Sequence, residues 1–149
     1  MSTTANLFTW DKLYSKIPGS SYFTWAEALW LPRVSAFANP SLEQQMNIMK
    51  VATAMEPVRK HFNMPITVTS WLRPDAYNKM IGGATFSFHK SGLAIDFIIP
   101  GLTIEHVKRE LINNKQLWPY RGENDTTTWI HVDLGGTNWF NGMVGRKTT

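Results

Sequence analysis

Hydrophobic residues recur at two different spacings along the chain, and each spacing predicts one kind of element. A spacing of three or four residues predicts helices over residues 22–31, 38–62 and 103–116. Each of these segments has residues suited to cap a first turn, namely Thr24, Ser41 with Gln44, and Thr103. Residues 74–83 predict a fourth, shorter helix, because proline opens the segment and two glycines close it.

The longest predicted helix, over residues 38–62, has an apolar stripe that should face the core. Its predicted members are Met46, Met49, Ala52 or Thr53, and Ala54 or Met55. Methionine in such a stripe fills a core more often than it serves a function. Pro57 lacks a backbone N–H, so we expect the helix to bend or restart there.

Alternating or continuous apolar residues predict strands over 66–72, 93–99, 119–124 and 126–135. The last two are joined by a polar turn, and the segment 93–99 is apolar enough to be largely buried. Helices come first and strands with helical inserts follow, which indicates an α+β fold with a small, mainly antiparallel sheet flanked by helices. We expect one domain over 1–149, with an N-terminal helical segment at about 1–40 and a motif-bearing core at about 41–140.

Composition narrows the chemistry that this domain can perform. The 149 residues are 43% hydrophobic and 17% charged, which is typical of a globular protein. There is no cysteine, so disulfides, thiolate zinc sites and a cysteine nucleophile are all excluded. Any metal must therefore be bound by histidine, aspartate or glutamate side chains.

Charge and the N-terminal residues indicate where the protein acts. The first twenty residues lack a basic segment followed by an apolar one, which predicts synthesis without a secretory signal. The net charge of +4 suits an anionic partner such as a bacterial cell wall. Basic residues gather only loosely, at Lys50, Arg59 and Lys60 and at Arg146 and Lys147, with no nucleic-acid motif. We therefore expect a monomer that binds neither nucleic acid nor membrane.

Polar residues interrupt two of the apolar strands. Asp96 lies inside LAIDFII, where a carboxylate costs several kcal/mol unless it is paired or metal-bound. His131 and Asp133 share one face of the strand in TWIHVDL, and His89 lies in the loop that enters the Asp96 strand. Two histidines and one aspartate would form a zinc site with an open fourth position. Spacing alone leaves a satisfied core histidine and a strand-edge aspartate as the alternative, whereas His61 and His106 read as surface groups on helices.

The stretch SFHKSGLAID fits the pattern Ser-x-His-x-x-Gly-x-Ala-x-Asp at Ser87, His89, Gly92, Ala94 and Asp96, and WIHVD fits the second half of the same signature. With these motifs, about residues 40–135 resemble the zinc D-Ala-D-Ala carboxypeptidase and L-alanyl-D-glutamate endopeptidase family. That family includes phage endolysins and shares its fold with the hedgehog signalling domain. The resemblance implies this hedgehog-like zinc peptidase fold.

The resemblance also implies roles for individual residues. His89, Asp96 and His131 match the zinc ligands, and Ser87 matches a serine that orients the site. Arg73 matches an arginine that binds a substrate carboxylate or carbonyl, although a surface salt bridge with Asp75 is the alternative reading. Gly92 and Ala94 are small enough to let the loop bring His89 beside Asp96.

The chain departs from the family where the general base is expected. Many members have an acid three residues before the last histidine, and here that residue is Thr128. Glu123 and Asp125 are the remaining candidates, and we favour Glu123 because Asn124-Asp125 is typical of a turn. Trp71 replaces the family's glycine and is expected to line or narrow the cleft.

These features predict a zinc metallopeptidase that cuts the peptidoglycan stem peptide. The favoured activity is that of a phage endolysin acting as an L-alanyl-D-glutamate endopeptidase, held in the host cytoplasm until lysis and then acting in the periplasm or cell wall. A D-Ala-D-Ala carboxypeptidase and a non-catalytic, zinc-containing wall-binding phage protein are the alternatives. A nucleic-acid binder that uses only the basic charge is a third.

Overall fold

A four-stranded antiparallel sheet forms the centre of the protein, whose computed structural model describes residues 7–142. The strand order is β3, β4, β6, β5, with bounds Thr67–Ser70, Ala94–Ile98, Ile130–Asp133 and Arg121–Gly122. All four predicted strands are present, each shorter than predicted. The α+β prediction with a small antiparallel sheet is confirmed.

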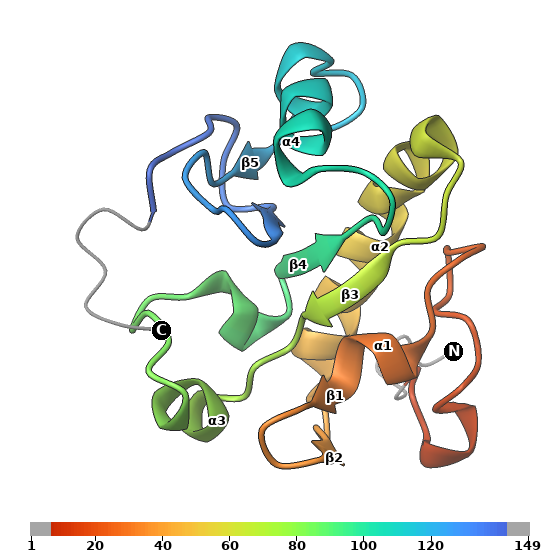
Figure 1. Cartoon of the computed structure of the whole chain (residues 1–149). Coiled ribbons are helices and arrows are strands. Elements are labelled where there is room, and N and C mark those ends of the chain that lie inside the picture. Colours follow the sequence, from red (N-terminus) through yellow and green to blue (C-terminus); the bar gives the residue numbers. More distant parts are fainter. Residues whose placement is uncertain (1–6, 143–149) are drawn as a thin grey trace.

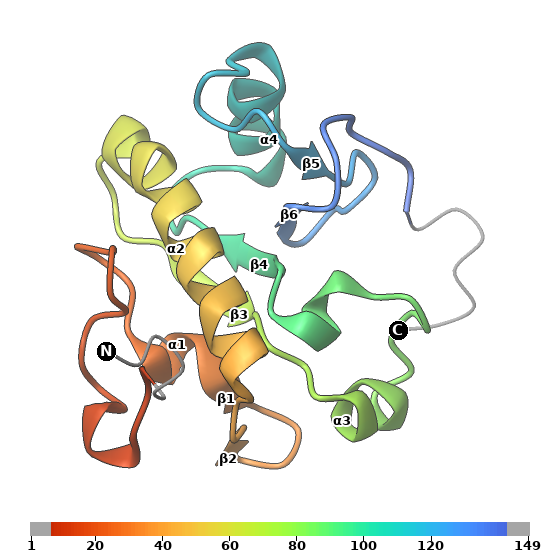
Figure 2. The ribbon, with the colours of Figure 1, turned by 180° about the vertical axis from the view of Figure 1, so that it is seen from behind.

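Helices surround this sheet on several sides. The longest, α2 (Leu42–Phe62), lies across one face of the sheet, behind it in Figure 1 and in front of it in Figure 2. The other α-helices are α1 (Trp25–Leu29), α3 (Asp75–Met80) and α4 (Ile104–Asn113), and two short 3₁₀ helices are η1 (Trp10–Lys12) and η2 (Phe88–Ser91). Within the described part, no helix is both long and apolar enough to cross a bilayer.

The predicted helix caps are all present. The side chains of Thr24 and Ser41 each accept a hydrogen bond from the backbone N–H three residues later. The side chains of Glu27 and Gln44 accept in turn from the backbone N–H of Thr24 and Ser41, which completes two capping boxes. Thr103 likewise accepts from the N–H of His106 at 3.1 Å. The helix predicted over 22–31 ends early, because Trp30–Leu31 (β1) pairs with Ala36–Phe37 (β2) in a hairpin. Strands of two residues are too short to show a period of two.

The predicted stripe of α2 is confirmed at Ala52 and Met55 and wrong at Met46. The residues fully buried against the sheet are Ile48, Val51, Ala52, Met55 and Val58, whereas Met46 is 46% exposed. The inward face also contains two polar residues, Gln45 and Asn47, which are buried because they hydrogen-bond to other segments. Buried polar side chains break the apolar spacing on which a sequence pattern depends.

Pro57 neither ends nor restarts α2, which continues to Phe62. Proline removes the hydrogen bond to the carbonyl of Thr53, and both residues lie on the exposed side of the helix. Water can satisfy that carbonyl, while the buried neighbours Met55 and Val58 hold the helix on the sheet. Packing therefore outweighs the local preference of proline.

The hydrophobic core is continuous from the first described residues to the last strand. Phe8, Ile17 and Phe23 from the N-terminal segment join the same cluster as the strands. Its largest fully buried side chains include three tryptophans, Trp25, Trp71 and Trp118. The division of the predicted domain into two segments stays a prediction, although the described part of 1–40 packs on this shared core.

Replacing Gln45 by Leu should destabilise the protein by about 2–4 kcal/mol. The Gln45 amide accepts from the backbone N–H groups of Leu7 and Phe8 and donates to the carbonyl of Pro40. Leucine fills similar space but leaves those buried groups without a partner. Urea unfolding measures the loss, and Met46→Leu on the exposed side of α2 should change stability by less than about 0.5 kcal/mol. Equal stability of the two variants would show that this tether contributes nothing.

Candidate metal centre

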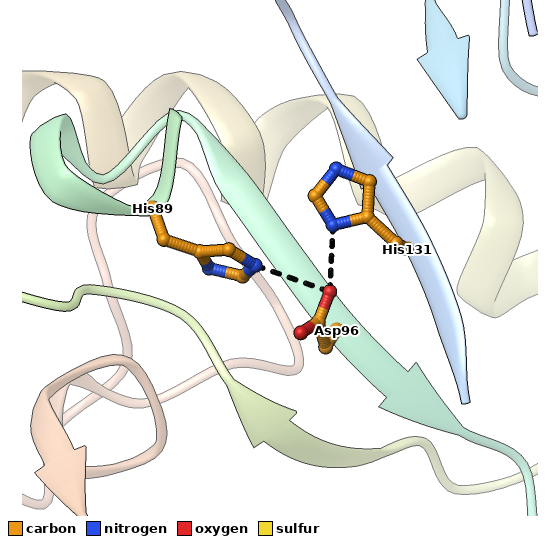
Figure 3. A group of neighbouring side chains, drawn as sticks. All are labelled: His89, Asp96 and His131. Carbon is orange, nitrogen blue, oxygen red and sulfur yellow. Dashed lines mark hydrogen bonds and ion pairs between the residues drawn. The ribbon is translucent and has the colours of Figure 1, made fainter. Parts of the chain in front are cut away.

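Three buried side chains from different elements meet above the sheet. They are His89 from η2, Asp96 from β4 and His131 from β6, as Figure 3 shows. Asp96 Oδ1 lies 3.1 Å from His89 Nε2 and 2.8 Å from His131 Nδ1. One possible ligand atom from each residue falls within 4.8 Å of the others. The structure thus brings together the three residues predicted as ligands.

Strand register and a short helix place these side chains. Asp96 and His131 are directly opposite each other on antiparallel β4 and β6, so their side chains share one face. His89 arrives from outside the sheet on η2, whose first turn is capped by Ser87 accepting from the His89 N–H at 3.1 Å. Ser87 therefore acts on the backbone of the His89 loop, in line with the orienting role predicted for it.

The loop that bears His89 is fastened to α2. Asn47 donates to the carbonyl of Ser91 at 2.9 Å, and Gln44 donates to that of Lys90 at 3.1 Å. Gly92 ends η2 with φ at +84°, and a Cβ there would lie 3.2 Å from the carbonyl oxygen of Gln44. Only glycine combines this left-handed backbone with so close an approach to the helix. The steric role predicted for Gly92 is therefore present, with α2 as the close neighbour.

Trp71 has a different role from the one predicted for it. It is 1% exposed and packs edge-on against Phe23 in the core, so it does not line the cleft. Its backbone carbonyl accepts a hydrogen bond from Nδ1 of His89 at 2.7 Å. A backbone group of the core strand segment therefore fixes the ring of His89 with Nε2 directed at Asp96.

The protonation of the histidines follows from their partners. Burial lowers the pKa of His89, and the charge of Asp96 only partly opposes this. With Nδ1 donating to a carbonyl, the neutral ring presents a lone pair at Nε2, and this buried atom makes no hydrogen bond within the described structure. Two electron-rich atoms, His89 Nε2 and Asp96 Oδ1, thus face each other in a buried space.

His131 is charged where His89 is neutral. Burial disfavours its charge, but hydrogen bonds to Asp133 and Asp96 outweigh burial and raise its pKa to about 9. Its Nε2 lies 2.8 Å from Asp133 Oδ2, and its Nδ1 faces Asp96. Carboxylates only accept, so the metal-free ring donates from both nitrogens.

Asp133 orients His131 and is itself fully paired. Arg121 donates to both of its oxygens, at 2.9 and 3.2 Å, and the N–H of Gly135 adds a third bond. Burial would raise the pKa of Asp133, but its bonds from His131 and Arg121 lower it. The Arg121 guanidinium also lies between the rings of Phe88 and Phe140, at 4.9 and 4.2 Å from their centroids.

Arg73 pairs with Asp96 and not with Asp75. It donates to Asp96 Oδ2 at 3.1 Å and to the hydroxyl of Ser70 at 2.8 Å, whereas Asp75 pairs with Lys90. The alternative reading of Arg73 as a partner of Asp75 was wrong. Burial would raise the pKa of Asp96, but the hydrogen bond and the charge of His131 hold it well below its usual value.

These atoms suit a divalent metal such as zinc. Zinc takes neutral imidazole nitrogen and carboxylate oxygen, and one donor atom from each of the three residues lies within 4.8 Å of the others. A cation placed among them would relieve the facing lone pairs of His89 and Asp96. Arg73 and Asp133 would support Asp96 and His131 from behind, the arrangement common around metal-bound histidine and carboxylate.

The metal centre opens into a cleft of about 600 Å³. Of the two candidate bases, only Glu123 lines this cleft. Glu123 lies in the wall of this cleft and is 1% exposed, and its charge helps to raise the pKa of His131. Asp125 lies in a separate groove beside α4 and accepts from the N–H of Gly142 at 3.1 Å. Thr128 is exposed at the rim of the cleft. His61 and His106 are exposed, as predicted.

Two residues of the centre had no predicted role. Asp133 was placed on the same face as His131 without a function, and Arg121 lies in the predicted strand 119–124 without being singled out. A usable signal exists, because Arg121 and Asp133 are opposite each other in the β5–β6 register. Two oppositely charged residues at matching positions of a predicted hairpin indicate a cross-strand pair.

Comparison with known families agrees with this geometry. The family model described as Peptidase M15 matches residues 25–133, which is most of the chain and contains the whole metal centre. The chain belongs to the Peptidase M15 family. M15 peptidases are zinc-dependent hydrolases, so membership makes this protein a metallopeptidase. No curated protein matches the chain at a significant level.

Zinc binding to this M15 peptidase should release about one proton at about pH 6. Metal-free His131 is protonated there because its pKa is about 9, and Nδ1 must lose its proton to bind zinc. His89 is already neutral, since its pKa is lowered. Calorimetric titration with zinc in buffers of different ionisation enthalpy counts the protons. A heat independent of the buffer would show that His131 is not protonated in the metal-free protein.

Replacing Asp133 by Asn should weaken zinc binding by about 10–100-fold. Asn can still accept from His131 Nε2, but it lacks the charge that makes the ring a stronger donor to the metal. Competition with a coloured chelator measures the affinity, and circular dichroism verifies the fold. Asp125→Asn is the matched control, because Asp125 lies in the other groove. Equal affinities for both variants would contradict a role for Asp133 in the metal centre.

Proposed function

We propose that this M15 peptidase is a phage endolysin that hydrolyses the L-alanyl-D-glutamate bond of the peptidoglycan stem peptide. The observation that carries the proposal is the cleft in which the His89–Asp96–His131 group and the buried carboxylate of Glu123 share one wall. A metallopeptidase needs an electrophilic metal and a base beside it, and this cleft offers residues for both.

His89, Asp96 and His131 would hold the zinc ion, which when bound would supply a Lewis acid for the scissile carbonyl and for a water molecule. Glu123 accepts the proton of the attacking water and delivers it to the leaving amine. Asp133 keeps Nε2 of His131 protonated, so that Nδ1 is the nitrogen that faces the metal. Arg73 holds Asp96 in place, and its position at the cleft also suits the substrate-binding role that the family resemblance implies.

Glu123 is the better of the two candidate bases. Its backbone N–H pairs with the carbonyl of His131 at 3.0 Å, so the residue is one strand away from a ligand. Gly142 packs on it so closely that a Cβ there would lie 2.6 Å from the Glu123 carboxyl carbon. Asp125 lines the groove beside α4, where Lys108 donates to the neighbouring carbonyls of Asn124 and Thr126.

The motif resemblance and the net charge support the proposed substrate and cellular setting. The five-position motif from Ser87 to Asp96 is shared with peptidoglycan peptidases, and the net charge of +4 suits an anionic wall. As an endolysin the protein would stay in the host cytoplasm until lysis and then reach the wall. A D-Ala-D-Ala carboxypeptidase would use the same metal chemistry on another bond. A non-catalytic wall-binding protein would keep the metal without a working base.

Replacing Glu123 by Gln should lower kcat by about 10²–10⁴-fold while zinc content stays at one ion per protein, because the amide cannot accept a proton. The matched control is Asp125→Asn, which removes a carboxylate two residues away and should keep activity within about twofold. Release of soluble peptide from purified peptidoglycan measures the rate, and atomic absorption measures the zinc. Full activity of Glu123→Gln would exclude it as the base, and loss in Asp125→Asn alone would transfer the role.

Mass spectrometry of the fragments from purified peptidoglycan identifies the bond. A new N-terminus on D-glutamate that a chelator suppresses supports the endopeptidase, and free D-alanine supports the carboxypeptidase. No fragment from folded, zinc-loaded protein would favour the non-catalytic alternative.

A further inference from the structure

Three arginines line the cleft, and two of them are already committed to carboxylates of the protein. Arg73 pairs with Asp96, and Arg121 pairs through two hydrogen bonds with Asp133. The third, Arg33, is exposed at the cleft wall. Among residues 7–142, its guanidinium makes no hydrogen bond or ion pair. The cleft therefore presents one arginine whose charge the described protein does not neutralise.

The backbone that carries Arg33 is fixed in place. Arg33 lies in the turn between β1 and β2, and its N–H donates to the hydroxyl of Tyr77 on α3 at 3.2 Å. Tyr77 is 9% exposed and also lines the cleft, so the bond ties the hairpin to α3. The ring centroids of Trp30 and Phe37, paired across the hairpin, lie 5.0 Å apart. An arginine on an anchored turn loses less entropy on binding than one on a loose loop.

The surroundings of Arg33 differ from those of the other two arginines. The cleft lining also includes the apolar side chains of Pro32, Ile81 and Phe86 and the ring of Tyr77, whose hydroxyl contacts the Arg33 backbone. Phe86 is 95% exposed. Apolar surroundings lower the local dielectric when a ligand covers them, which strengthens a charge-assisted hydrogen bond. A planar anion with two oxygens matches the guanidinium fork.

We propose that Arg33 is a specificity-determining residue that binds a carboxylate of the stem peptide. The inference rests on the proposed function, because a stem peptide with D-glutamate carries such free carboxylates, both at D-glutamate and at its C-terminal residue. Arg33 binds the substrate through the β1–β2 hairpin, on the side of the cleft remote from β6. This contact is additional to any made by Arg73, which donates to Asp96 and Ser70.

The test compares one stem peptide with versions in which a single carboxylate is amidated, either at D-glutamate or at the C-terminus. The native protein should lose about tenfold in kcat/KM, mainly through KM, when the carboxylate contacted by Arg33 is amidated. Arg33→Gln should lose the same factor on the unmodified peptide and then show no further loss on amidation. Arg33→Lys keeps the charge without the fork and should be intermediate.

Lys60→Gln is the matched control, since it removes one positive charge from an exposed position on α2 outside the cleft lining. It should stay within about twofold of the native protein, which separates a direct contact from general attraction of an anion. Thermal melting checks that each variant is folded. The proposal is overturned if Arg33→Gln keeps the full preference for the carboxylate, or if Lys60→Gln loses as much as Arg33→Gln.

Failure of the proposed function is a separate outcome. If the native protein cleaves none of the peptides, calorimetric binding of the same peptides to the zinc-loaded protein tests Arg33 alone. A tenfold difference in Kd between the acid and one amide that Arg33→Gln removes would support the Arg33 site without hydrolysis. No binding, or equal binding of acid and amides by the native protein, would overturn it.

Discussion

A carboxylate buried in a strand is the constraint on which the rest of this structure depends. Asp96 is 5% exposed between two strands of the central sheet, and removing an ion from water to such a place costs several kcal/mol. Two neighbours offset that cost: the charged ring of His131 across the β4–β6 pair, and Arg73 beyond the end of β3. Each of these is held by contacts of its own. The polar residues of the metal centre are thereby organised around one negative charge.

Sequence patterns predicted the elements better than the faces they present. The caps at Thr24, Ser41 and Thr103 are short-range hydrogen bonds, so a local reading finds them. The inward face of α2 was predicted only in part, because Gln45 and Asn47 are buried through hydrogen bonds to residues far away in the chain. The β1–β2 hairpin was missed because it depends on tertiary packing more than on its two-residue strands. In each case the missed feature depends on a contact with a residue that is distant in the sequence and close only in the folded chain.

The candidate site was more predictable than the packing, because buried charge is rare and leaves a trace in the sequence. Asp96 and His131 stood out as polar residues inside apolar strands, and the structure brings them together with His89. The groups that hold the three ligands in place could not be recognised in the sequence in this way. The carbonyl of Trp71 is a backbone atom, and the role of Trp71 in the core could not be read from its residue type. Arg121 is an ordinary strand residue until its register opposite Asp133 is known.

Arg121 connects the two histidine arms of the centre without any metal. It pairs with Asp133, which holds His131, and it stacks on Phe88, the residue directly before His89. The ligand set is thus assembled by protein contacts and the hydrophobic core, in contrast to small zinc domains that fold only around their ion. Loss of the ion would then empty the site without unfolding the protein. Such a protein can be stored empty and loaded later, so the supply of metal, and not refolding, would set how quickly it becomes competent.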